Sequence, residues 1–134
     1  MFGENGMNAL SFVAIGSGAA CGAWLRWALG ELINSVYPPM PLGTLAANLM
    51  GSFLMGLALV LLVERGLLPP EMRIAAITGF LGSLTTMSTF SAEAMVLIAR
   101  ADYVIAAGLV SLHVAGSILM VFTGVLAARV LTGS

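Results

Sequence analysis

The sequence contains few charged residues. Among its 134 residues there are 5 Lys or Arg and 6 Asp or Glu, so charged residues make up 8% of the chain, whereas hydrophobic residues make up 60%. A soluble domain carries roughly 25% charged residues, and this chain could not cover its own surface with so few. The scarcity of charge therefore excludes a soluble domain. The net charge of −1 gives no reason to expect a nucleic-acid partner.

Cysteine and histidine, which commonly bind transition metals, are also scarce. A single cysteine, Cys21, excludes both a disulfide within the chain and a cysteine-rich metal site. The one histidine and the scattered carboxylates have no spacing typical of transition-metal ligands, and no nucleophile–base pair is apparent. We therefore predict that the protein is not an enzyme.

Four hydrophobic segments are long enough to cross a membrane, since each has roughly 20 mostly apolar residues. They cover about 10–33, 42–63, 74–99 and 103–128. The residues before them contain Glu4 but no Lys or Arg, unlike a signal peptide, and Met7 is a second candidate start site. Short links make successive helices antiparallel. We therefore expect one all-α domain, 1–134, of four transmembrane helices.

Small residues recur at four-residue spacing, which lets helix backbones approach closely in lipid. The pairs are Gly18 and Gly22, Ala47 and Gly51, Ser52 and Gly56, and Ser111 and Ala115. This spacing fits contacts within one subunit and contacts between subunits equally well. Four thin helices leave no room for a hydrated path along their centre, so a pore formed by this chain would have to use an interface between copies.

The arginines define an orientation only weakly. Arg65, Arg73 and Arg129 are expected on one side of the membrane and Arg100 on the other. With so few basic residues, the positive-inside rule hardly selects a side. We therefore expect that the chain can insert in both orientations, with a slight bias toward a cytoplasmic N-terminus.

The third segment is interrupted by glycine and hydroxyl residues between Thr78 and Ser91. Six of the nine residues from Ser83 to Ser91 are Ser or Thr. A broken helix at bilayer depth persists only where protein or water surrounds it, and its free carbonyls and helix ends can meet ions. Carbonyls near Gly82 and Thr85 could coordinate a hard cation such as sodium. The hydroxyl groups that follow could donate hydrogen bonds to an anion, although isolated hydroxyls often bond back to their own helix.

Two polar residues are expected at similar depth on antiparallel neighbours. Arg26 lies near the end of the first segment and Asn48 near the start of the second. A permanent cation and an amide donor together would attract anions. The alternatives are that Arg26 extends toward the lipid headgroups and that Asn48 only links helices. Ionisable residues within a span are functional candidates by default.

Further polar residues lie on the third and fourth segments. Glu93 follows Phe90 by three residues and shares its helical face. A carboxylate there could be neutral, paired with an arginine or directed away from an ion. His113 and Ser117 share one face of the fourth segment, at the depth of the interruption. They could line a pore, or His113 could be a hydrogen-bonded packing residue.

These motifs resemble the Fluc (CrcB) family of fluoride channels over nearly the whole chain. The matching elements are Gly22-Ala23-Trp24-Leu25-Arg26-Trp27, Gly43-Thr44-Leu45-Ala46-Ala47-Asn48, Thr78 to Glu93, and His113 with Gly116-Ser117. The resemblance implies a fold with a broken third helix and an antiparallel, dual-topology homodimer. It also implies two fluoride pores at the dimer interface, in the inner cell membrane, and no further protein partner is evident.

The resemblance also implies roles for single residues. The backbone carbonyls of Gly82 and Thr85 from both subunits would hold a structural sodium ion at the dimer centre. Arg26 would be the cation of the vestibule. The side chains expected along the pore are Asn48, Met87, Ser88, Thr89, Phe90, His113 and Ser117. Met87 stands where the family usually has the first of two phenylalanines, so we expect altered throughput at that position.

The resulting hypothesis is passive export of fluoride. Fluoride enters cells as HF and dissociates at the higher internal pH, so an open pore lowers its internal level. The alternative is a proton-coupled exporter of the small multidrug-resistance type, which needs an embedded acid in the first helix. Here the buried charge is Arg26, and Glu31 lies near the helix end. A non-transporting membrane subunit would leave the hydroxyl-rich interruption unexplained.

Overall fold

The computed structural model describes residues 8–133, so the expectations that concern Glu4 and Met7 lie outside the described residues. The described part of the chain is helical, with short links. Its elements are α1 (Ala9–Ile33), α2 (Leu42–Ala58), η1 (Leu59–Glu64), α3 (Pro70–Ile74), η2 (Ala75–Leu81), α4 (Gly82–Leu84), α5 (Met87–Ala99) and α6 (Tyr103–Thr132), of which η1 and η2 are π-helical.

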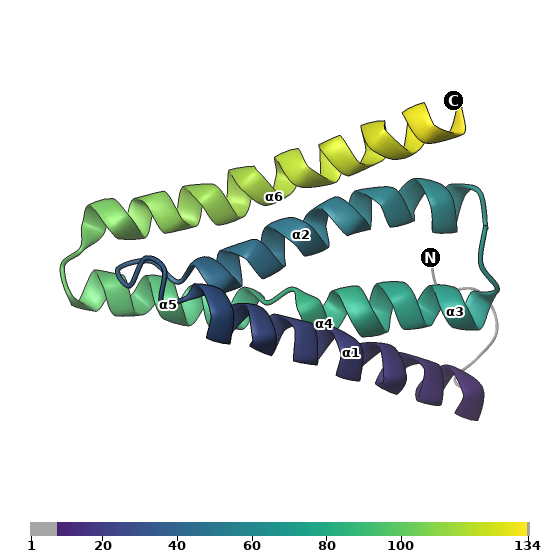
Figure 1. The fold of residues 1–134 in the computed structure, drawn as a ribbon, viewed down its shortest axis with the longest axis horizontal. Coiled ribbons are helices and arrows are strands. Elements are labelled where there is room, and N and C mark those ends of the chain that lie inside the picture. The colour runs from purple at the N-terminus through teal and green to yellow at the C-terminus, as the bar shows by residue number, and fades with distance from the viewer. Residues whose placement is uncertain (1–7, 134) are drawn as a thin grey trace.

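These elements form four candidate membrane spans, as expected. The spans are Ala9–Ile33, Leu42–Glu64, Pro70–Ala99 and Tyr103–Thr132, each long and apolar enough to cross a bilayer. In Figure 1 the four rods lie side by side with their long axes roughly aligned. The protein is therefore an all-helical, multi-pass membrane protein.

The helix ends follow local sequence signals. The Asn8 side chain accepts a hydrogen bond from the Ser11 N–H at 2.7 Å and caps α1. The third span begins at Pro70, four residues before the expected position, because proline suits the first helical position, where no N–H partner is required. The fourth span continues past residue 128 and ends at Gly133, whose φ of 69° is left-handed.

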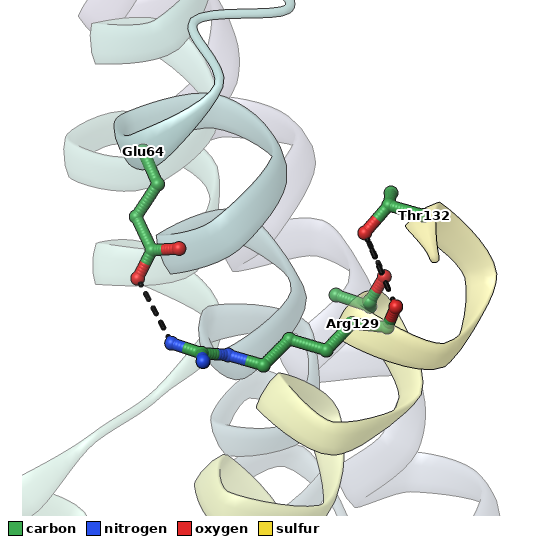
Figure 2. A network of polar contacts seen from close by, with 4 residues as sticks. Glu64, Arg129 and Thr132 are labelled. Atoms are coloured by element: carbon green, nitrogen blue, oxygen red, sulfur yellow. Dashed lines mark hydrogen bonds and ion pairs between the residues drawn. The ribbon is translucent and has the colours of Figure 1, made fainter. Parts of the chain in front are cut away.

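Polar contacts join the second and fourth spans at one end of the molecule, as Figure 2 shows. Arg129 pairs with Glu64 at 3.6 Å, and both side chains are half exposed. Arg65 donates a hydrogen bond to the Thr132 carbonyl at 3.3 Å near the end of α6. An exposed ion pair contributes about 0–1 kcal/mol, so this cluster aligns the helix ends more than it stabilises the fold.

Three of the four small-residue pairs lie at contacts within the chain. A Cβ on Gly18 or Gly22 would overlap carbonyl oxygens of the third span, and one on Gly56 would overlap the Val121 carbonyl of α6. Ala47 is completely buried. The fourth pair, Ser111 and Ala115, is exposed on α6. Close backbone approach therefore joins α1 to η2 and α2 to α6.

The expected interruption of the third span is confirmed. Thr85 has φ −84° and ψ 152°, and Thr86 has φ −151° and ψ 116°, so two extended residues separate α4 from α5. Figure 1 shows the interruption as a short non-helical connection between α4 and α5. Leu84, just before it, is fully buried. Thr86 is buried as well, whereas Gly82 and Met87 on either side are exposed, so one face of the break packs inside the bundle and the other lies at its surface.

A leucine at Gly124 is expected to destabilise the fold. A Cβ at this position would overlap the Phe53 carbonyl of α2, whereas a Cβ at Gly16 has nothing within 4 Å. Overpacking costs about 1–3 kcal/mol, so Gly124→Leu should lower the thermal unfolding midpoint in detergent micelles and Gly16→Leu should not. Equal midpoints for the two variants would contradict the close α2–α6 contact.

Candidate ion-conducting site

One side chain binds the broken backbone. The Asn48 Nδ2 donates to the Thr86 carbonyl at 3.1 Å, and the Thr86 N–H donates to Asn48 Oδ1 at 2.7 Å. Both residues are buried. In an extended segment at membrane depth these backbone groups have no helical partner, and leaving them unpaired is costly. Asn48 supplies the donor and the acceptor that the break requires.

Asn48 also joins the fourth span to the break. Its Nδ2 lies 3.0 Å from His113 Nδ1, and the His113 ring stacks on Phe90 with ring centroids 4.4 Å apart and an interplanar angle of 24°. His113 is 4% exposed and Phe90 6% exposed. Three residues from α2, α5 and α6 thus form one buried cluster directly beside the interruption.

The hydroxyl groups after the break form a compact cap on α5. The Thr86 hydroxyl accepts from the Thr89 N–H at 3.1 Å and donates to Thr89 Oγ1 at 3.0 Å, and Ser88 Oγ lies 3.3 Å from Thr86 Oγ1. Thr85 and Ser91 instead donate to carbonyls one turn earlier in their own helices, at 2.9 and 2.8 Å. Several hydroxyls are thus occupied by local bonds, and Ser88 and Thr89 belong to the cap.

A groove of about 380 Å³ runs beside this cluster. It collects five of the seven side chains expected along the pore. Its lining residues are Asn48, Gly51, Ser52, Met55, Leu81, Thr85, Thr86, Met87, Phe90, His113, Val114, Ser117, Ile118 and Val121. None of these lining residues is Asp, Glu, Lys or Arg. Met87 is 72% exposed at the groove, and Ser88 and Thr89 lie outside the lining.

Arg26 lies away from the groove. Its Nε donates to the Ser83 carbonyl at 2.9 Å, which links α1 to the last turn before the break. In an uninterrupted helix this carbonyl would accept from residue 87, so Arg26 replaces a lost partner. Arg26 and Asn48 do reach the same break, but the structure does not bring them together in one site.

The break releases backbone carbonyls. In a continuous helix the Thr86 N–H would donate to Gly82 and the Thr89 N–H to Thr85. These two donors are bonded to Asn48 Oδ1 and to Thr86 Oγ1 instead. Gly82 is exposed and Thr85 half-buried. Carbonyl oxygens are ligands that hard cations prefer, so the two residues expected to bind sodium have the chemistry for it.

A second polar pair lies one turn from the cluster. Thr44, one turn before Asn48 on α2, donates to Glu93 Oε1 at 2.5 Å. The other carboxylate oxygen, Oε2, is buried and has no hydrogen-bond partner among the described residues. Of the alternatives left open for Glu93, pairing with an arginine is not what the described residues show, because its hydrogen-bond partner is the Thr44 hydroxyl.

Comparison with known proteins assigns the family. The family model described as CrcB-like protein, Camphor Resistance (CrcB), matches residues 13–125. The chain belongs to the CrcB family. It is 49% identical to a protein of Ralstonia nicotianae and 51% identical to one of Cupriavidus taiwanensis, each over 93% of this chain and 99% of the relative. A Nitrosospira multiformis protein is 47% identical over 92% of this chain and 96% of the relative, and all three are named fluoride-specific ion channel FluC.

Sequence reasoning assigned no role to two residues that form polar contacts at the break or one turn from it in this CrcB-family chain. Thr86 caps α5 with its hydroxyl and binds Asn48 through its backbone. A threonine three residues before another hydroxyl, just after an interruption, is a helix-start signal that could have located it. Thr44 binds Glu93, and only its position four residues before Asn48 indicated that it lies on the same helical face.

Replacing Asn48 by alanine is expected to destabilise the protein. The Thr86 N–H and carbonyl would lose their partners, and a buried unsatisfied group costs about 1–3 kcal/mol. Asn48→Ala should therefore lower the thermal unfolding midpoint, followed by tryptophan fluorescence in detergent. The control is Ser91→Ala, which removes an exposed hydroxyl that only bonds to its own helix. If the two variants have the same unfolding midpoint, the Asn48–Thr86 contact does not stabilise the fold.

Proposed function

We propose that this protein is a passive, fluoride-selective channel of the inner cell membrane that lowers the internal fluoride level. Membership of the CrcB family makes it a channel rather than an enzyme. The observation that carries the assignment is the groove beside the broken third span, where Asn48, Phe90, His113 and Ser117 meet. The ion is taken from the relatives, which are named for fluoride.

The groove has the chemistry of a neutral anion path. Hydroxyl groups donate hydrogen bonds, and the rim of the Phe90 ring carries partial positive charge. No carboxylate is among the lining residues. Conduction requires binding that is strong enough for entry and weak enough for release. Neutral donors in an apolar wall meet both requirements for a dehydrated halide.

The groove of one chain is open, and we propose that a second, antiparallel copy closes it. Met87, Val114 and Ile118 line the groove yet are largely exposed in the single chain. Three arginines lie toward one end of the molecule and Arg100 toward the other, so neither orientation is strongly favoured. A homodimer of opposite orientations would contain two grooves and hence two pores.

Sodium is the ion we propose at the dimer centre. The Gly82 and Thr85 carbonyls, released by the break, would hold it together with the same groups of the second copy. A hard cation would neutralise partial negative charge that otherwise faces lipid or the partner. In this proposal the ion is structural, and fluoride is the transported species.

The proton-coupled exporter is less well supported. Its embedded acid has no counterpart in α1, where the polar residue at depth is Arg26 and the carboxylate, Glu31, is exposed near the helix end. A non-transporting subunit would have no use for a polar groove at the middle of the span. Both alternatives predict no selective fluoride flux from the purified protein.

Liposomes that contain the protein are expected to lose fluoride rapidly and to retain chloride. The groove offers donors to a small anion but no fixed charge that would hold a larger one. Efflux is followed with fluoride- and chloride-selective electrodes after addition of an ionophore for the counter-cation. Equal loss of the two anions, or no loss, would contradict the proposed function.

The same assay separates pore side chains from the scaffold. Phe90→Ile removes the ring edge and is expected to slow fluoride efflux roughly tenfold, the factor that corresponds to about 1.4 kcal/mol of barrier. The matched control is Phe12→Ile, because Phe12 lies 82% exposed on α1. Both variants should elute like the parent in size-exclusion chromatography. Parental flux from Phe90→Ile would remove this residue from the pore.

An antiparallel dimer is expected to cross-link at the break. With Cys21 replaced by serine, Gly82→Cys should form a disulfide-linked dimer on mild oxidation in liposomes, because Gly82 is exposed and would face its twin. Gly16→Cys, on exposed α1, should stay monomeric on a denaturing gel. Replacing sodium by N-methylglucamine should speed exchange of subunits between parental dimers in detergent. Cross-linking at residue 16 alone would contradict the proposed interface.

A further inference from the structure

The orientation of the Asn48 amide is fixed by the backbone. The Thr86 N–H can only donate, so the atom 2.7 Å from it must be the acceptor Oδ1. The Nδ2 then faces the Thr86 carbonyl, which can only accept, at 3.1 Å. If the amide were rotated by 180°, Nδ2 would face the Thr86 N–H, which is also a donor, and Oδ1 would face the Thr86 carbonyl, which is also an acceptor. The position of each Asn48 atom follows from this pairing.

The fixed amide selects one tautomer of His113. The second N–H of Asn48 Nδ2 is directed at His113 Nδ1, 3.0 Å away. Two N–H groups cannot hydrogen-bond to each other, so Nδ1 accepts and carries no proton. In a neutral imidazole the proton is then on Nε2. A doubly protonated ring would again oppose two donors, so the contact fits the neutral ring.

The Nε2–H donor is buried and has no hydrogen-bond partner among the described residues. A buried donor without a partner is costly, and such groups mark sites where a ligand or ion completes the bonding. His113 lines the groove, and stacking on Phe90 holds the plane of its ring. The described residues thus leave this donor for an acceptor that they do not themselves supply.

We infer that His113 is a selectivity residue: its neutral ring carries the proton on Nε2, and this N–H donates a hydrogen bond to the permeating fluoride beside Phe90. The inference rests on the proposed function and assigns one atom of the same site. Fluoride is the smallest halide and a strong acceptor, so it gains most from a sheltered single donor. A neutral donor also releases the ion, which a fixed cation at this depth would retain.

The tautomer can be measured on the unaltered protein, because His113 is the one histidine in the sequence. With ¹⁵N-labelled histidine and no histidine tag, the nitrogen spectrum in lipid should show a protonated Nε2 and an unprotonated Nδ1. Fluoride should shift the Nε2 signal and its proton, whereas chloride should not. A proton on Nδ1, or no response of Nε2 to fluoride, would overturn the inference.

Two variants separate donation to the ion from support of Asn48. His113→Gln places an amide donor near the position of Nε2 but loses the acceptor at Nδ1. His113→Asn keeps an acceptor near Nδ1 but loses the distal donor. We expect the glutamine variant to keep fluoride efflux within about threefold and the asparagine variant to lose on the order of ten- to a hundredfold, the range of a hydrogen bond to a charged group.

Fluoride flux from the parent protein distinguishes a failure of this inference from a failure of the proposed function. Equal loss in both variants, or greater loss in the glutamine variant, would make His113 a support for Asn48 and overturn the inference, although the parent still conducts. If the parent itself passes no fluoride, the proposed function fails, and the inference with it. Size-exclusion elution and melting midpoints confirm that each variant is folded before its flux is compared.

Discussion

The double hydrogen bond between Asn48 and the backbone of Thr86 is the contact on which the site depends. Two extended residues inside a membrane span would otherwise leave an N–H and a carbonyl unpaired in an apolar medium. The amide satisfies both groups at 2.7 and 3.1 Å. Because this contact keeps the break open, it also keeps the Gly82 and Thr85 carbonyls and the α5 cap outside the regular helical pattern.

One consequence is that the structural roles of these residues coincide with the ion-handling roles proposed for them. Asn48 holds the break and fixes His113, while His113 stacks on Phe90. Loss of flux in an Asn48 variant therefore does not by itself identify a pore residue, since the whole cluster depends on that amide. His113 and Phe90 are better probes, because neither binds the broken backbone. The arrangement explains how a short chain combines a stable fold with a polar site at bilayer depth.

Hydropathy predicted the four spans, because a membrane requires about 20 apolar residues whatever their packing. Glycine and hydroxyl density likewise located the interruption to within a few residues. Contacts between side chains on different spans could not be predicted from the sequence. Arg26 and Asn48 were expected at a similar depth, yet Arg26 donates to the Ser83 carbonyl and Asn48 to the Thr86 carbonyl. Which face a side chain takes depends on helix rotation, and this in turn depends on close contacts such as Gly56 with α6.

Arg26 and the groove lie on different sides of the broken third span. On the α1 side, a permanent cation binds the Ser83 carbonyl in the turn before the break, where negative partial charge gathers at a helix end. On the α2 and α6 side, neutral groups line an open surface. A cation inside that groove would hold an anion too tightly to pass it. Placing the charge behind the third span keeps the break anchored and the groove neutral.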